Sequence, residues 1–469
     1  MDILTPVVPV ERQHPNFRLL SSFELSGPEQ AVLQSWADGF RDRDGKFAKE
    51  FQTTYNSSFW ELYLFAAFSE LGCQIDQQHS SPDFVLDSPG GKLIAEATIA
   101  SHPDGYAPEW ERSADPETVL GISREEIVTL ASIRLANAIT AKHRKYTESY
   151  STLPHVAGKP YVICVAPFEQ PYFFRQNNLA IRRVLYGFDQ HIYSDDEATG
   201  TRTVFGETTR ESVTKDNGTQ VQLGLFTRSG MEDVSAVIFS TTATFSKAQA
   251  LAAAGPYPVV FFAERYNADG LKPYVIRLPR PVYRETLLDG LQVCLNPLAA
   301  RPLDPGWLVE RGAALHSFDP STGKYLAMAP DGFLISRVSR GFLPPGGTAG
   351  HARAPQPSDT FKRPRLPEFP EGQLVPVGGQ VMTNVDHHLA HYRGWTIMVA
   401  RDVVDNDWGA QAFEGLYRSL SECQAGTTPR CHLLARGWYP SPAEALEEAK
   451  GRVDAEIGRR SGAQETPSR

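Results

Sequence analysis

The sequence predicts a mixed α/β fold followed by a smaller α+β domain. In the first part of the chain, a helical pattern precedes three short strand patterns, a second long helix and a nearly all-apolar strand. A segment rich in proline and glycine then interrupts the chain, and such a composition is typical of a linker. After it, a strand pattern and a capped helix pattern indicate a second folding unit.

Three helices are expected before the strand at 161–167. In residues 26–40 a serine can cap the first turn, a proline suits that turn, and apolar residues recur every fourth position. Residues 56–72 carry an apolar stripe that stops at a glycine. Residues 123–146 form the third pattern, which ends in a cluster of basic side chains.

Short apolar runs predict the strands of the sheet, with an SPGG turn joining the second and third of them. These runs are 73–78, 82–87, 92–98, 161–167, 234–241 and 258–264. The run at 161–167 is almost wholly apolar, which is typical of a strand buried on both faces. A helix is expected near 246–253, and residues 272–343 read as short strands and loops.

A polar stretch, 187–232, predicts a hairpin-like insertion in this domain. Strands are expected at 201–207 and 219–226, on either side of an Asp-Asn-Gly turn at 216–218. The full division is therefore a domain at 1–343, a linker at 344–380 and an accessory α+β domain at 381–469.

Composition narrows the class of protein. With 469 residues the chain exceeds one compact core, and 41% hydrophobic with 22% charged residues is ordinary for a globular protein. The net charge of −9 argues against a general nucleic-acid coat, because non-specific affinity depends on Lys and Arg contacts to phosphates. One local basic groove remains compatible with that charge.

Five scattered cysteines without a CxxC pair indicate neither a disulfide framework nor a zinc ribbon. A reducing, cytoplasmic location is expected. The first residues show no signal-peptide pattern, and no apolar run approaches the roughly 20 residues that span a bilayer. We therefore expect no membrane partner.

Two carboxylates mark the candidate site. Asp83 follows Pro82 at the start of one strand, and Glu96 lies in the middle of the next, on the same face as Ile94 and Thr98. A hairpin across the SPGG turn would bring both acids together. Since a buried carboxylate is costly unless it is paired or binds a cation, and hard oxygen ligands favour Mg²⁺ or Mn²⁺, a divalent metal site is expected.

Pro82-Asp83, twelve intervening residues and Glu96-x-Thr98 resemble the signature of the PD-(D/E)xK nuclease superfamily. The element order over residues 55–167 also resembles the αβββαβ core of that restriction-endonuclease-like fold. The resemblance implies that Asp83 and Glu96 hold the metal, that the Ala97 carbonyl is a further ligand, and that Glu61 supplies an additional acidic one.

The resemblance departs from the family at its third position, where Thr98 replaces lysine. In some members the basic residue comes from the following helix, and Lys142 or Lys145 would then substitute; Lys92 is a weaker candidate. The activity implied is Mg²⁺-dependent phosphodiester hydrolysis, on DNA in preference to RNA, by an enzyme that often dimerises and often serves in restriction or phage defence.

Alternatives stay open at this point. Ser58 and Glu61 match a capping box, so Glu61 could serve a helix start instead of a metal. The basic end of the helix at 123–146 could simply complement the helix dipole. With Thr98 in place of lysine, the domain could be a catalytically inactive module that binds a protein or nucleic-acid partner. A glycosidase acid pair is a third, weaker interpretation.

One further motif is a histidine cluster at 387–391. Its i, i+4 spacing would suit a metal if the segment were helical, but no HExxH arrangement accompanies it. Surface histidines are the expectation.

Overall fold

The structure is a computed structural model of the 469-residue chain. It describes residues 1–22, 26–102, 108–111, 123–196, 201–252, 255, 257–268, 273–341, 375–376, 387–393, 395–401, 408–414, 432–434, 439 and 441–462. The chain forms two compact units, one of residues 1–113 and 122–341, the other containing the described residues after Gly341. Each unit has its own hydrophobic core. The predicted linker at 344–380 lies outside the described residues except for 375–376.

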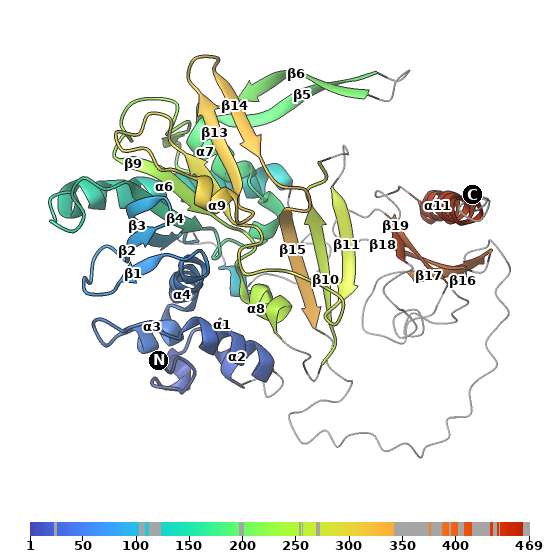
Figure 1. The fold of residues 1–469 in the computed structure, drawn as a ribbon, viewed down its shortest axis with the longest axis horizontal. Coiled ribbons are helices and arrows are strands. Elements are labelled where there is room, and N and C mark those ends of the chain that lie inside the picture. Colours follow the sequence, from blue (N-terminus) through green and yellow to red (C-terminus); the bar gives the residue numbers. More distant parts are fainter. Residues whose placement is uncertain are drawn as a thin grey trace, which may run out of the picture. The chain divides into compact units, whose positions relative to one another are not determined.

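The first unit is built on an eight-stranded mixed sheet in the order β1-β2-β3-β4-β9-β12-β13-β14 (Figure 1). Strands β1, β2 and β3 are antiparallel neighbours, whereas β3, β4 and β9 run parallel. The strands are β1 Gln74–Asp76, β2 Phe84–Ser88, β3 Gly91–Ile99, β4 Tyr161–Ala166, β9 Val234–Phe239, β12 Gln292–Leu295, β13 Ala314–Asp319 and β14 Lys324–Met328. The first five confirm the strands predicted between 73 and 241.

Helices cover both faces of this sheet. On β3, Leu93 and Ala95 pack in one core with α4, while Ile94 packs in another core with α6 (Figure 1). The helices of the unit are η1 Val10–Arg12, α1 Pro15–Ser22, α2 Gly27–Trp36, α3 Phe47–Thr53, α4 Tyr55–Glu70, η3 Glu109–Glu111, α6 Arg124–Lys145, η4 Tyr146–Tyr150, η5 Phe173–Gln176, α7 Leu179–Tyr186, α8 Phe245–Leu251 and α9 Gly306–Val309. The sequence order α4-β1-β2-β3-α6-β4 is therefore the helix–strand order that was expected.

Buried hydrogen bonds fix α4 against the sheet. Trp60 Nε1 donates to the Cys164 carbonyl at 3.0 Å, and the Tyr63 hydroxyl donates to the Leu287 carbonyl at 2.9 Å. Both side chains are fully buried, so their polar ends need these partners. These two hydrogen bonds fix which side chains of α4 face strands β2 and β3.

Two sequence predictions about strands were wrong in part. The run at 258–264 is strand β10 (Val259–Arg265), but it lies in a separate three-stranded sheet between β11 (Tyr274–Pro279) and β15 (Leu334–Gly341). An apolar run shows that a strand is buried but not which sheet buries it.

The insertion contains two hairpins where one was expected. Strand β6 (Thr201–Thr209) pairs with β5 (Phe188–Asp196), and the Asp-Asn-Gly turn instead joins the short strands β7 (Ser212–Thr214) and β8 (Gln220–Gln222). The turn itself was placed correctly, and Gly218 adopts the positive φ that this turn requires. The error lay in the partner of β6.

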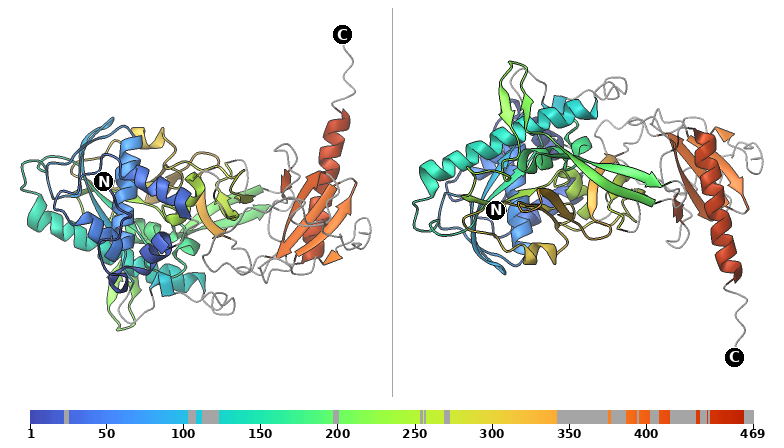
Figure 2. Two further views of the ribbon diagram at one scale, coloured as in Figure 1. Left: turned by 90° about the horizontal axis from the view of Figure 1, so that it is seen from below. Right: turned by 90° about the horizontal axis from the view of Figure 1, so that it is seen from above.

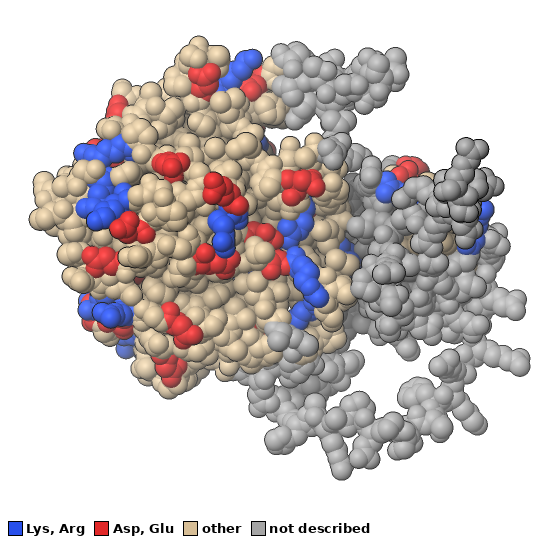
Figure 3. Space-filling model, in the orientation of Figure 1, with Lys and Arg blue, Asp and Glu red and all other residues tan. Residues whose placement is uncertain are grey.

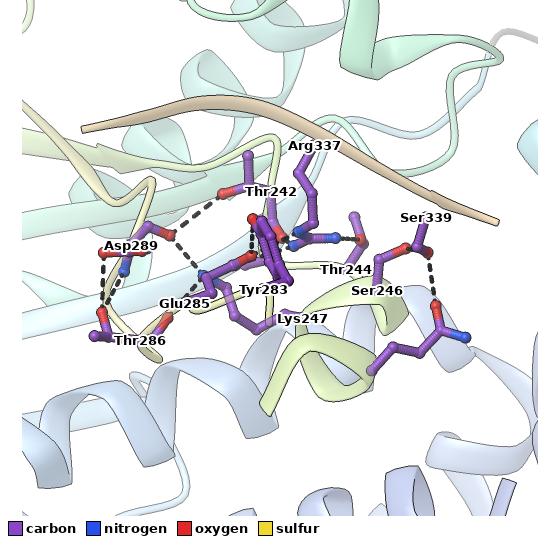
Figure 4. A network of polar contacts seen from close by, with 12 residues as sticks. Thr242, Thr244, Ser246, Lys247, Tyr283, Glu285, Thr286, Asp289, Arg337 and Ser339 are labelled. Carbon is purple, nitrogen blue, oxygen red and sulfur yellow. Dashed lines mark hydrogen bonds and ion pairs between the residues drawn. The ribbon is translucent and has the colours of Figure 1, made fainter. Parts of the chain in front are cut away.

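A fully buried charge network links α8, β15 and the segment 283–289 (Figure 4). Glu285 pairs with Lys247 through one oxygen, and its other oxygen accepts from Arg337 Nε at 2.9 Å and from the Tyr283 hydroxyl at 2.8 Å. Burial lowers the pKa of Lys247. For Glu285, burial opposes ionisation, but Arg337 and Lys247 outweigh it and lower the pKa. Loss of one partner would leave an uncompensated buried charge.

The second unit is an antiparallel sheet with one helix packed on it (Figure 2). Its strands, in the sheet order β16-β17-β18-β19-β20, are Val375–Pro376, His387–Tyr392, Trp395–Arg401, Trp408–Glu414 and His432–Leu434. Helix α11 (Pro442–Gly462) begins at a capping pair, in which Ser441 and Glu444 bond each other. Its Ala445 and Ala449 pack against the sheet, which confirms the capped helix.

The histidine cluster lies on β17, a strand. Residues i and i+4 of a strand share a face but stand roughly 13 Å apart, too far to bind one ion. The helical metal spacing therefore does not apply to His387 and His391.

No helix in the described parts of the chain is long and apolar enough to span a bilayer. Cys73, Cys164 and Cys294 are buried free thiols, while Cys423 and Cys431 lie outside the described residues.

Candidate active site

Asp83 and Glu96 meet where β2 begins. The register pairs Phe84 with Ala95, so the residue before β2 lies opposite Glu96. The Asp83 amide donates to Glu96 Oε2 at 3.3 Å, and the Ala97 amide donates to Asp83 Oδ2 at 2.8 Å. The two predicted carboxylates therefore share one locus, and the backbone of each strand holds the acid of the other.

Glu96 is 1% exposed, and it is buried because strand alternation places it on the face that α6 covers. Three donors converge on its Oε1: Lys142 Nζ at 2.8 Å, Lys145 Nζ at 3.1 Å and the Tyr150 hydroxyl at 3.2 Å. Burial opposes ionisation of this carboxyl, but Lys142 and then Lys145 outweigh it and lower the pKa of Glu96. Glu96 is thus held as a carboxylate inside the protein.

The two lysine donors lie at the end of α6. Lys142 and Lys145 are three positions apart, so they lie on one side of the last helical turn. The chain then continues as the π-helical turn η4, which ends at Tyr150. Lys145 Nζ lies 4.9 Å from the centre of the Tyr150 ring. Partial burial opposes the charge on Lys145, but hydrogen bonding to Tyr150 and attraction by Glu96 raise its pKa.

Asp83 is harder to ionise than an exposed aspartate. Burial and then the Glu96 carboxylate raise the pKa of Asp83 to about 6, against the opposing effect of Lys142. A carboxylate with a raised pKa beside a second carboxylate is the electrostatic condition that a bound cation relieves.

Glu61 is a third acid near Asp83 and Glu96. Burial and then the charge of Asp83 raise the pKa of Glu61 to about 8, and Arg43 Nη2, 3.8 Å away, opposes that rise. The capping interpretation of Glu61 was wrong: α4 begins at Tyr55, so Ser58 lies inside the helix and is buried. Glu61 therefore faces the carboxylate locus from the second turn of α4.

The Ala97 carbonyl points to the same side of β3 as its amide, towards Asp83. In a strand the N–H and C=O of one residue point to the same side, and the Ala97 amide is bonded to Asp83. The β2–β3 ladder ends at the Phe84–Ala95 pair, so the Ala97 carbonyl lies beyond its last rung. The donor set is thus carboxylate and carbonyl oxygen, the type that Mg²⁺ and Mn²⁺ prefer.

Those residues fit a divalent cation chemically. In the parts of the chain that the structure describes, no three His, Cys, Asp or Glu side chains lie close enough to share an ion as they stand. The nearest set is Asp83, Glu96 and the backbone of Ala97, and the charge of Asp83 acts on Glu61. Direct ligation by Glu61 stays a prediction.

Thr98 opens onto a cavity next to the carboxylates. It lies on the same strand face as Glu96, and with Lys142 it lines a space of about 270 Å³. The other lining residues are Ile99, Ser101, Arg134, Asn137, Ala138 and Ala141. Lys92, by contrast, is exposed and pairs with Asp87 at the far end of β3, so it does not reach the site.

Sequence reasoning missed Tyr150, Arg43 and Arg134. Tyr150 arrives through a π-helical turn, for which the sequence carries no periodic signal. Arg43 comes from the segment between α2 and α3, and Arg134 from the middle of α6. The i+3 spacing of Lys145 from Lys142 indicates a common helix side, whereas Arg134 precedes Lys142 by eight positions, which is not such a spacing.

A comparison with models of protein families, with curated proteins and with solved structures finds no match. The function of the site is therefore inferred from its own geometry.

Proposed function

We propose that the chain is a metal-dependent nuclease of the restriction-endonuclease-like fold, which hydrolyses phosphodiester bonds in DNA or RNA. The observation that carries the proposal is the convergence of Asp83 and Glu96 with two lysines from α6 on Glu96. The order α4-β1-β2-β3-α6-β4 supports it, because that order places an acid at the start of β2 and another within β3.

The residues divide into two roles. Asp83, Glu96 and the Ala97 carbonyl would hold Mg²⁺ or Mn²⁺, and the bound cation would favour the ionised form of Glu61 beside them. Such an ion polarises a phosphodiester and lowers the pKa of bound water. Lys142 and Lys145 keep Glu96 ionised and oriented, and supply the positive charge that Thr98 lacks. In the reaction a water oxygen bonds to phosphorus, one ester P–O bond breaks, and the leaving oxygen takes a proton.

Nucleic-acid contact would be local. On the face shown in Figure 3, acidic and basic side chains of the described residues are interspersed. Around the carboxylates, in contrast, Arg43 pairs with Glu61, and Lys142 and Lys145 pair with Glu96. This agrees with a net charge of −9 for the chain and a confined basic rim.

The decisive experiment is calorimetric titration of Mg²⁺ and Mn²⁺ into wild type, Asp83→Ala and Glu96→Ala. The same samples would be assayed on plasmid, single-stranded DNA and RNA. We expect metal binding and cleavage to be lost together in both variants. Asp87→Asn is the matched control, because Asp87 is an exposed acid at the other end of β2. No metal binding by the wild type would reject the proposal.

The alternative is an inactive module of the same fold that binds a partner. Thr98 and the double lysine pairing of Glu96 Oε1 favour it, because that pairing can neutralise Glu96 without a metal. It predicts that the wild type binds no divalent ion and that Asp83→Ala leaves partner binding unchanged.

A further inference from the structure

The cavity beside Thr98 forms a groove along α6. Arg134, Asn137, Ala138 and Ala141 line it at spacings of three, four and seven positions, which is one face of a helix. Lys142 closes the end of the groove nearest Glu96, and Ser101 and Arg134 lie at the other end. Small alanine side chains in the middle leave room for a ligand to approach the helix.

Arg134 is positioned for an anion. Its Nε donates to the Ser101 carbonyl at 2.6 Å, which fixes the guanidinium at the end of β3. Within the described residues it has no acidic partner within 4 Å, whereas Arg43 pairs with Glu61 and Arg183 pairs with Glu125 and Asp189. A guanidinium that the described residues hold by one nitrogen can offer its two terminal nitrogens to a phosphate.

Arg134 lies away from the carboxylate site along α6. Arg134 and Lys142 are eight residues apart, which is roughly 12 Å along a helix. Lys142 is held on Glu96 and Arg134 on Ser101, so one phosphate would not contact both. A ligand that fills the groove and reaches both ends must carry at least two phosphates.

We propose that Arg134 and Asn137 form a subsite for a second phosphate of the strand being cut, one that flanks the scissile phosphodiester. This rests on the proposed function and goes beyond it. The substrate is then a polynucleotide strand, and small phosphodiesters use only the carboxylate site. Arg134 acts as a binding residue that selects substrate length.

The test uses the full chain and two substrates. Wild type and Arg134→Gln are compared on a fluorescein-labelled oligonucleotide and on bis(p-nitrophenyl) phosphate, with Mn²⁺. We expect kcat/KM for the oligonucleotide to fall roughly 10- to 100-fold, because a charge-assisted hydrogen bond is lost. Activity on the small diester should stay unchanged. Arg124→Gln is the matched control, since Arg124 is an exposed arginine at the start of the same helix.

Binding gives a readout that does not depend on turnover. Anisotropy of the oligonucleotide with EDTA present is measured over a range of salt concentrations. Arg134→Gln should reduce the slope of log K against log salt by about 0.7 to 0.9, the effect of one phosphate contact. Asn137→Asp keeps the Arg134–Ser101 bond and places a negative charge in the groove, so it should also weaken binding, with melting temperature confirming that both variants fold.

The outcomes are distinguishable. Wild type that cleaves both substrates while Arg134→Gln and Asn137→Asp match it would overturn the subsite and leave the nuclease proposal standing. Wild type that cleaves only the small diester and binds no oligonucleotide would overturn the subsite as well. Wild type inactive on both substrates would reject the proposed function, and the subsite with it.

Discussion

Lys142 Nζ lies 2.8 Å from Glu96 Oε1, although the two residues are 46 positions apart. The contact joins the last turn of α6 to the middle of β3. Thr98, two residues after Glu96 on the same strand face, carries no charge, so the helix supplies the cation that the strand lacks. We propose that this ammonium group takes the role of the lysine that the nuclease signature has at the position of Thr98.

The role of Lys142 can be tested by moving the lysine from α6 to residue 98. Lys142→Met should lower metal-dependent cleavage roughly 100-fold, the scale of one positioned charge or proton donor. Adding Thr98→Lys to that variant should restore part of the loss, because residue 98 shares the face of Glu96. The measurement is kcat/KM on one oligonucleotide. Lys92→Met is the control, since Lys92 is exposed at the far end of β3.

Full activity in both Lys142→Met and Lys145→Met would show that neither amine takes part in the reaction. Rescue by Thr98→Lys is the more specific result, because a purely structural role of Lys142 in packing α6 would not be restored from the strand.

The raised pKa of Glu61 predicts a gain in stability when its charge is removed. Glu61 titrates near 4.5 when unfolded and at about 8 when folded, so stability is lost as pH rises through that interval. Glu61→Gln should therefore raise the free energy of unfolding at pH 9 by roughly 1–3 kcal/mol and change it little at pH 4. The measurement is urea unfolding with EDTA present.

Glu70→Gln is the control, because Glu70 is a partly exposed acid at the end of the same helix. A destabilising effect of Glu61→Gln at pH 9 would contradict the assigned electrostatics. Mg²⁺ should raise the stability of the wild type more than that of Glu61→Gln, because the added acid strengthens attraction for the ion.

The buried network around Glu285 predicts a large cost for removing one charge. Glu285→Gln should lower the free energy of unfolding by roughly 3–5 kcal/mol, since Lys247 and Arg337 would be left without their carboxylate. Replacing all three charged residues by apolar ones of similar size should cost less than the single change. Glu310→Gln, at an exposed position, should stay within about 0.5 kcal/mol of wild type. Denaturant unfolding measures the free energy of unfolding for each of these variants. If Glu285→Gln destabilises the protein as little as Glu310→Gln does, the network contributes little.

Local sequence patterns were enough to predict the carboxylate pair. Asp83 and Glu96 could be predicted to meet because a turn joins their strands and side chains alternate along each strand. The order α4-β1-β2-β3-α6-β4 followed from periodicity in the same way. Neither inference needs more than about twenty consecutive residues of sequence.

The remainder depends on contacts that no local pattern encodes. An S-x-x-E motif predicts a cap, but Tyr55 and Asn56 extend α4 past it, so Glu61 is free to face Asp83. Strand β10 was misplaced because it pairs with β15, a segment distant in the sequence. The partner of β6 was missed because no strand was predicted at β5, which immediately precedes it. Tyr150 reaches Glu96 from η4, a π-helical turn that continues α6 with i→i+5 bonds.

His316 makes stability depend on pH in the opposite direction from Glu61. It is 3% exposed, with Nδ1 2.6 Å from the Tyr325 hydroxyl and Nε2 2.9 Å from Gln292 Oε1. Burial and then the charge of Arg182 lower its pKa to about 3. As pH falls below 6.5, the unfolded chain takes up a proton that the folded protein does not, so stability falls by up to roughly 1.4 kcal/mol per pH unit.

His316→Gln should remove that part of the slope between pH 6.5 and 4, because glutamine can both donate and accept hydrogen bonds but does not titrate there. Gln292→Leu breaks one of the same hydrogen bonds without removing the imidazole. It should therefore lower the free energy of unfolding by a similar amount at each pH and leave the slope in place. Equal slopes for wild type and His316→Gln, measured by denaturant unfolding across this range, would mean that acid destabilisation arises at other groups.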